Sequence, residues 1–227
     1  MRVLAVDTSS EHGSVSVTDR DEAVGEIDLA TSIQHSERLF HSIEFVFRYL
    51  PFQLQDIDIF AAACGPGSFT GLRVGIAAME AFAAANRKRG VGVTTLQALA
   101  WKTGIREVSV APIIDAGRGD IYGAVYRRNN ANGRGDTLIE ERRPVVLKPA
   151  EWVASLPRQP LIFCGDGAIR YRSLLQEREW RIHSMDLYLA RTVAELATTP
   201  NSGSLSPVYV RKPDAEIARE SIGSPNS

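Results

Sequence analysis

The chain has 227 residues with 44% hydrophobic and 23% charged side chains, which fits one folded domain or two small lobes and excludes a disordered chain. A formal net charge of −1 at pH 7 argues against independent nucleic-acid binding, since affinity for a phosphate backbone needs concentrated lysine and arginine. No apolar stretch reaches the roughly 20 residues of a membrane span and the N-terminus is unlike a signal peptide, so we expect a cytoplasmic protein without membrane contact whose two cysteines stay reduced.

Three strands and a helix are predicted in the N-terminal part. Residues 2–7 form an apolar run that ends on an aspartate, and residues 14–18 and 23–29 alternate as half-exposed strands do. A helix is expected over residues 36–50, with Pro51 ending it. Its apolar side chains recur at helical spacing, at Leu39, Ile43, Val46, Phe47 and Leu50.

The most informative segment is residues 64–75, Cys-Gly-Pro-Gly-Ser-Phe-Thr-Gly-Leu-Arg-Val-Gly. The apolar run 57–63 before it predicts a strand, and its glycines and proline permit a tight strand-to-helix turn. Ser68 is the expected N-cap of a long helix that runs to Arg89, with Gly90 ending it. The chain therefore contains a strand–turn–helix unit at its centre.

A glycine turn that leads into a helix presents backbone N–H groups to anions. A purely structural role for these glycines, in a tight turn and close packing, stays equally open. A P-loop is excluded because Leu72 and Arg73 stand where Lys and Ser/Thr would follow Gly71, and a dinucleotide fingerprint would follow the first strand of its domain. The candidate anion or nucleotide contacts are Asp7, Thr8, Gly65, Gly67, Ser68 and Thr70.

A short strand at 91–93 and a helix from Thr94 or Thr95 to Lys102 complete a first lobe with the element order βββαβαβα. By analogy, this is the order of a ribonuclease-H-like lobe.

The second half looks like a copy of the first. The strand 108–115 ends on Asp115 before a glycine-rich turn, as the first strand ends on Asp7. Residues 161–168 repeat the pattern of an apolar strand followed by Cys-Gly-x-Gly, and residues 169–177 then read as helical. These matches favour a duplicated lobe over coincidence.

A polar, glycine-bearing hairpin tip is expected at residues 127–135, the most basic exposed segment. A solvated loop is favoured there over an RNA contact, because Asp136, Glu140 and Glu141 dilute the positive charge. The last helix is predicted over residues 186–198.

The predicted division of the chain is a first lobe over residues 1–106, which contains the docking helices, and a second lobe over residues 107–215. Residues 202–207 read as a Ser/Gly linker, and residues 216–227 as a frayed tail.

Four segments together carry a resemblance to a known family. The longest is residues 65–75, Gly-Pro-Gly-Ser-Phe-Thr-Gly-Leu-Arg-Val-Gly. The others are residues 3–9, Val-Leu-Ala-Val-Asp-Thr-Ser, residues 34–36, Gln-His-Ser, and residues 207–211, Pro-Val-Tyr-Val-Arg. Over residues 1–215 the chain resembles TsaB, the bacterial partner subunit in threonylcarbamoyladenosine modification of tRNA. The resemblance implies an α/β protein with the two-lobed actin-like, ribonuclease-H-like (ASKHA) fold.

The sequence offers no catalytic constellation. None of its four histidines has metal-ligand spacing, and Ser68 lacks a Gly-x-Ser-x-Gly elbow. The catalytic TsaD-type sister family carries two histidines four residues apart, and the resemblance places Thr95 and Leu99 there. Neither side chain can replace an imidazole on a catalytic metal. We therefore predict no catalytic residue, metal or cofactor in the isolated chain, and the resemblance implies ATP and metal on the partner subunit.

The long helix is apolar around most of its circumference. One face is expected to cover the sheet, and the other, rich in glycine and alanine, to allow close approach by a partner helix. The alternative is that both faces are buried within the lobe. The predicted partner contacts are Phe40, Phe47, Leu72, Gly75, Ile76, Met79 and Phe82.

Together with the missing catalytic residues, the resemblance implies a non-catalytic subunit that docks onto and activates a TsaD-type subunit for threonylcarbamoyl transfer to adenosine in tRNA. The resemblance also implies a TsaE-type ATPase as a partner and contact with tRNA only through the complex. Two alternatives stay open. One is an independent metallopeptidase or ATP-dependent phosphotransferase of the same fold, and the other is a structural homodimer that uses the same helices.

Overall fold

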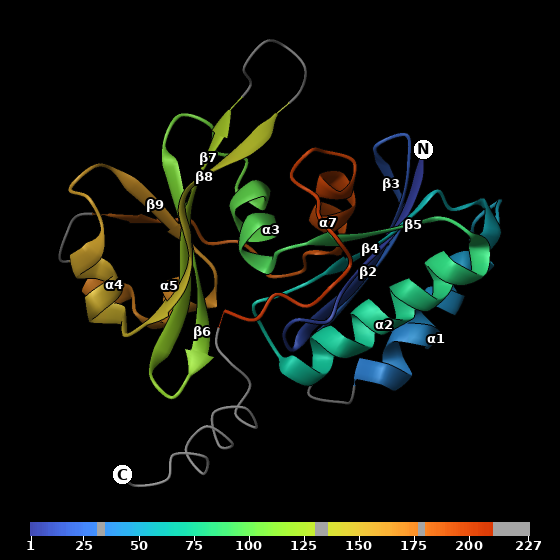
Figure 1. The fold of residues 1–227 in the computed structure, drawn as a ribbon, viewed down its shortest axis with the longest axis horizontal. Coiled ribbons are helices and arrows are strands. Elements are labelled where there is room, and N and C mark those ends of the chain that lie inside the picture. The colour runs from blue at the N-terminus through green and yellow to red at the C-terminus, as the bar shows by residue number, and fades with distance from the viewer. Residues whose placement is uncertain (31–34, 130–135, 177–179, 211–227) are drawn as a thin grey trace, which may run out of the picture.

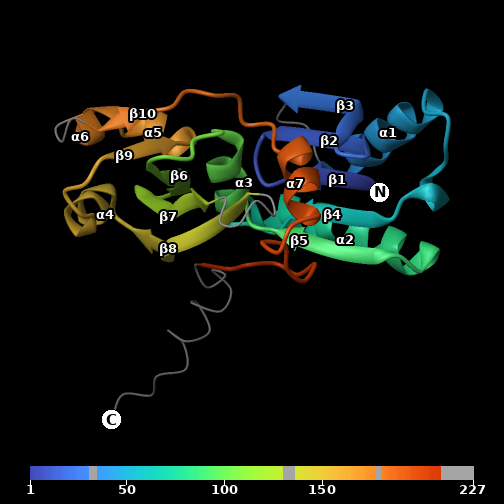
Figure 2. The ribbon, with the colours of Figure 1, turned by 90° about the horizontal axis from the view of Figure 1, so that it is seen from above.

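The computed structural model describes residues 1–30, 35–129, 136–176 and 180–210, with the backbone alone described at 35–37. These residues form two five-stranded sheets that stand side by side (Figure 1). Two helices, α3 (Thr95–Lys102) and α7 (Ala190–Ala197), lie between the two halves of the molecule in both views (Figure 2). The predicted tail at 216–227 and most of the hairpin tip at 127–135 lie outside the described residues.

The first sheet has the strand order β3-β2-β1-β4-β5. Strand β1 pairs antiparallel with β2 through a short hairpin and parallel with β4, which the chain reaches through a helix. Strands β1 and β4 are apolar on both faces because helices cover both sides of the sheet. The strands are β1 (Arg2–Asp7), β2 (His12–Asp19), β3 (Glu22–Ala30), β4 (Ile59–Ala63) and β5 (Arg89–Val93).

Helices α1 (His35–Arg48) and α2 (Phe69–Asn86) run beside each other over one face of this sheet, and a 3-10 turn (Leu54–Asp56) precedes β4. The N-cap of α2 is Ser68, as predicted. The predicted end of α2 at Arg89 is wrong. The helix ends at Asn86 because Arg87 takes a left-handed conformation, with φ 54°, and donates its N–H to carbonyl oxygens of the last turn. Gly90 therefore lies inside β5.

The second sheet has the order β10-β9-β6-β7-β8, which repeats the topology of the first. Its strands are β6 (Ser109–Gly117), β7 (Asp120–Asn129), β8 (Thr137–Leu147), β9 (Leu161–Cys164) and β10 (Arg181–Ile182). Its outer helices are α4 (Pro149–Ser155), α5 (Asp166–Arg170) and α6 (Arg172–Gln176). The predicted duplication of the lobe is therefore confirmed.

The repeat extends to single hydrogen bonds at the first strand of each lobe. At the end of β1, the Asp7 carboxylate accepts the N–H of Ser9, two residues on, at 2.9 Å. Near the end of β6, the Asp115 carboxylate accepts the N–H of Gly117 at 3.0 Å. Each aspartate thus begins its turn in the same way, as the sequence suggested.

One hydrophobic core runs across both lobes. It joins side chains of β1, β4 and β5 to those of α3 and α7, and continues into β6, β7 and β9 of the second sheet. A second core lies under α1 and α2, and a third lies under α4 to α6. Because the first core is shared, neither lobe buries its inner face without the other.

The C-terminal part returns to the first lobe, which the predicted boundary at 107–215 missed. Helix α7 covers β1, β2 and β4, and the N–H of Ala190 donates to the Ser14 hydroxyl. The predicted helix 186–198 is shorter and begins at Ala190. Residues 202–207 are no free linker, since Gly203 pairs with Gly92 of β5 and Leu205 is buried in the core under α2.

We expect Leu196→Ala to destabilise the protein by about 2–5 kcal/mol, because Leu196 is fully buried between the lobes and its removal leaves a cavity. Ile139→Ala removes an exposed apolar side chain and should cost less than about 1 kcal/mol. Urea unfolding of both variants measures the difference. Equal effects would mean that α7 contributes little to the first lobe.

Candidate functional site

The turn after β1 and the glycine turn before α2 are bound directly to each other. The Thr8 hydroxyl donates to the carbonyl oxygen of Gly71 at 2.7 Å, and the N–H of Ser68 donates to the carbonyl oxygen of Ser9 at 2.7 Å. The Ser68 hydroxyl in turn accepts the N–H of Gly71. These backbone groups of the α2 N-terminus are therefore used within the chain.

Two glycines allow this contact. A Cβ at Gly67 would lie 2.5 Å from the carbonyl oxygen of Ser9, and a Cβ at Gly75 would lie 2.4 Å from the Thr8 hydroxyl oxygen. Neither position has room for a side chain unless the two turns separate. The packing role that the sequence left open is thus present at both glycines.

The other predicted anion contacts do not converge on one place. Gly65 has φ +102°, and a Cβ there would lie 3.0 Å from the carbonyl oxygen of Val208. Its conformation and its packing therefore both favour glycine. Thr70 is exposed on α2, and Thr8 is buried. Gly67 and Ser68 are the predicted contacts that line the cleft described below.

Asp7 is fully buried at the end of β1. Its Oδ1 accepts the N–H of Ser9, while its Oδ2 has no hydrogen-bond partner among the described residues. Burial raises the pKa of the Asp7 carboxyl to about 6, against the weaker opposing effect of its hydrogen bonds to Ser9. The Asp7 carboxyl, Ser14 and Ser42 are among the residues that line a cavity of about 20 Å³. This cavity is large enough for one water molecule.

A larger cleft of about 540 Å³ lies between the lobes. The turns after β1 and β6, the glycine turn, the start of α3 and the start of α5 line it. Its acidic side chains are Glu11, Asp115 and Asp166, and Arg170 forms an ion pair with Asp115. Asp166 Oδ1 accepts the N–H groups of Asp115 and Gly167, and burial raises the pKa of its carboxyl.

Thr95 and Leu99 both line this cleft, one turn apart on α3. They are the positions at which the resemblance predicted missing histidines. Within the part of the chain that the structure describes, no group of three or more His, Cys, Asp or Glu side chains is placed to hold a metal ion. Among the described residues, no helix is long and apolar enough to cross a membrane.

The predicted partner contacts on α2 are mostly buried. Leu72, Gly75, Ile76 and Met79 belong to the lobe's own interior, where α2 packs on β1, β4 and α1. They cannot touch a partner while the lobe is folded, so this part of the predicted surface is corrected. Phe82 is half-buried between Phe40 and Phe60.

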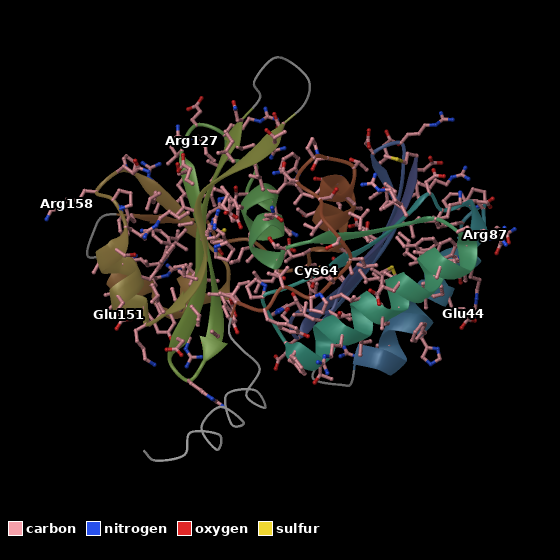
Figure 3. The ribbon with its side chains drawn as sticks, viewed as in Figure 1. Glu44, Cys64, Arg87, Arg127, Glu151 and Arg158 are labelled. Atoms are coloured by element: carbon pink, nitrogen blue, oxygen red, sulfur yellow. The ribbon has the colours of Figure 1, made fainter. Side chains whose placement is uncertain are left out.

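An accessible apolar surface lies instead on α1 and on Tyr49, the residue that follows its last turn. Phe40 is 50% exposed, Phe45 52% and Tyr49 72%, and the rings of Phe45 and Tyr49 meet edge to face at 5.3 Å. Phe47, a predicted contact, turns inward onto Phe52. Phe45 was not among the predicted contacts. Its position outside the buried stripe of Leu39, Ile43 and Val46 could have indicated that it is exposed. Glu44 lies on the outer side of the same helix (Figure 3).

Two duplicated lobes of ribonuclease-H-like topology, with a cleft between them, define an actin-like protein. The solved structures agree: a protein from Pseudomonas aeruginosa described as similar to peptidase YeaZ matches with a TM-score of 0.76 and 24% identity, covering 92% of this chain and 99% of that one. The ethanolamine utilization protein EutJ from Carboxydothermus hydrogenoformans matches with a TM-score of 0.51 and 14% identity, covering 86% and 90%. These likenesses concern the fold.

Sequence comparison gives the family. The family model described as TsaD, tRNA N6-adenosine threonylcarbamoyltransferase, matches residues 29–172. The tRNA threonylcarbamoyladenosine biosynthesis protein TsaB of Escherichia coli is 34% identical over 66% of this chain and 63% of its own length. TsaB of Bacillus subtilis is 26% identical over 78% and 76%. The chain belongs to the TsaB family of TsaD-like proteins, and its match spans less than two thirds of the Escherichia coli relative.

We expect Gly75→Ala to destabilise the protein by about 1–3 kcal/mol, because the added methyl group overlaps the Thr8 hydroxyl. In a Thr8→Ala background the same change should cost less, since the overlapping atom is gone. A double-mutant cycle measured by urea unfolding tests this coupling. Strict additivity of the two changes would show that Thr8 and Gly75 do not contact each other.

The buried Asp7 carboxyl also predicts a pH dependence. Its pKa in the folded state is above the unfolded value, so its contribution to stability is largest below about pH 4 and is lost as pH rises through 6. A shift of about two units corresponds to about 3 kcal/mol. Asp7→Asn keeps the Oδ1 acceptor but cannot ionise. Between pH 4.5 and pH 7 the free energy of unfolding should therefore fall more in the parent protein than in Asp7→Asn. An equal fall in both proteins would contradict the raised pKa of Asp7.

Proposed function

We propose that this chain is the non-catalytic subunit that docks onto a TsaD-type subunit and supports threonylcarbamoyl transfer to adenosine in tRNA. The names of its TsaB relatives and the TsaD family model support the pathway. The exposed aromatic face of α1 is the structural observation that carries the docking role. In this proposal the protein is cytoplasmic, tRNA is reached only through the complex, and a TsaE-type ATPase is a further partner.

The docking face is suited to helix-to-helix contact. Large aromatic side chains that protrude from a folded surface are typical anchors of protein interfaces. Beside them, α2 exposes Ala77, Ala81 and Ala84 at helical spacing, so a second backbone can approach closely there. A TsaD-type partner shares the fold of this chain, which makes pairing through equivalent helices geometrically simple.

The cleft residues favour a non-catalytic subunit over an enzyme. Thr95 and Leu99 occupy the cleft positions of the sister family's histidines, and neither can hold a catalytic metal. ATP and metal belong to the partner subunit in this proposal. The competing functions are an independent metallopeptidase or ATP-dependent phosphotransferase, which would show turnover in the isolated chain, and a homodimer through α1, which would show in its solution mass.

We expect the double variant Phe45→Ala/Tyr49→Ala to weaken binding to the TsaD-type subunit by about 1–3 kcal/mol and to lower tRNA modification accordingly. Excess variant should restore modification by mass action. Binding affinity and threonylcarbamoyl transfer to tRNA by the reconstituted complex are the two readouts. Ile169→Ala, which removes an exposed apolar side chain from the second lobe, is the matched control and should change neither.

Two outcomes would contradict this proposal. Unchanged affinity in the double variant would place the partner elsewhere. Full partner binding by Asp7→Asn with no transfer at any subunit concentration would mean that the chain contributes directly to the chemistry.

A further inference from the structure

The interlobe cleft carries more negative than positive side chains, whereas a phosphate-binding site needs positive charge. None of the described residues that line it is lysine or arginine, whereas Glu11, Asp115 and Asp166 are acidic. Arg170 neutralises Asp115 through its ion pair. His12 is the one basic side chain among the described lining residues, so Glu11 and Asp166 have no lysine or arginine partner in the cleft lining. An anion entering this cleft would meet like charge, and a cation would meet opposite charge.

Much of the remaining cleft lining is apolar. Leu99, Ile114, Tyr122, Leu187 and Leu189 line it, and its volume of about 540 Å³ is that of a small-molecule pocket. A bare metal ion does not suit such a surface, and no metal-ligand cluster occurs among the described residues. The lining fits a ligand with an apolar stem.

A buried hydroxyl independently points to a missing ligand. Thr95, at the first turn of α3, lines the cleft and is 4% exposed, yet its Oγ1 has no hydrogen-bond partner among the described residues. Buried polar groups without partners are rare because each costs the lost hydration. A donor group bound in the cleft would satisfy this oxygen.

Two of the N–H groups that could bind a phosphate at the start of α2 are already engaged. Ser68 donates to the Ser9 carbonyl and Gly71 donates to the Ser68 hydroxyl, so this glycine turn differs from an open phosphate loop.

We propose that the interlobe cleft binds an organic cation, a primary ammonium or guanidinium group on an apolar stem, and not a nucleotide phosphate. Asp166 supplies the countercharge, the Thr95 hydroxyl accepts a hydrogen bond, and the leucine-rich lining holds the stem. The ammonium group can come from a free polyamine or from a lysine side chain that a partner protein inserts.

The test uses the whole chain and four probes in ligand-observed NMR and calorimetry. Spermidine represents the free polyamine and N-acetyl-lysine methylamide the inserted side chain, while hexane-1,6-diol and ADP control for the stem and for phosphate. We expect at least one amine to bind, more weakly at high salt, and the diol and ADP not to bind. The better amine identifies the source.

Asp166→Asn keeps the oxygen that accepts two backbone N–H groups but removes the charge, so it should weaken amine binding about tenfold. Glu151→Gln, on the outer side of α4 far from the cleft, should bind as the parent does (Figure 3). Glu11→Gln, at an exposed position, serves as a second variant if Asp166→Asn fails to fold. Binding of ADP in preference to both amines, no binding of either amine, or amine binding unchanged in the charge-removing variants would overturn the proposal.

Discussion

The hydrogen bond from the Thr8 hydroxyl to the Gly71 carbonyl holds the end of β1 against the first turn of α2, and the arrangement of the first lobe depends on it. The bond forms only because Gly67 and Gly75 carry no side chains where the two turns meet. Beside it, the N–H of Ser68 donates to the Ser9 carbonyl oxygen and the N–H of Gly71 to the Ser68 hydroxyl, two donors that an open phosphate loop would leave free. The glycine-rich segment, which in the sequence could also bind an anion, therefore packs the end of β1 against the start of α2 in the structure.

Local patterns in the sequence were enough to predict the features that a few neighbouring residues determine. The Ser68 N-cap, the aspartates that begin the turns at Asp7 and Asp115, and the repeated Cys-Gly-x-Gly turns follow from short motifs, and the duplicated topology follows from their order. The strand predicted to end on Asp115 instead continues to Gly117. The helical period of α2 also predicted an apolar helix. It could not tell how many sides are covered, because that depends on α1 and the sheet together, and so Met79 was placed on the surface although it is fully buried.

What the sequence could not predict depends on residues far apart in the chain. Gly75 meets Thr8 across 67 positions, so no local pattern distinguishes its packing role from a partner contact. The return of α7 to the first sheet is likewise a long-range contact, and the predicted lobe boundary assigned it to the wrong lobe. The charge of the cleft comes from turns in both halves, which is why an anion site was expected where acidic side chains gather.

The shared core has a consequence for how this protein can work. Many two-lobed proteins act by closing a hinge around a ligand, which requires lobes that separate without exposing apolar surface. Here α7 packs against the first sheet and α3 against the second. The two helices contact each other, and Trp101 of α3 donates its indole N–H to Glu195 of α7 at 2.9 Å. Opening the cleft widely would expose part of the main hydrophobic core. A rigid body of this kind suits a subunit that presents a fixed helical face to a partner better than one that closes around a substrate.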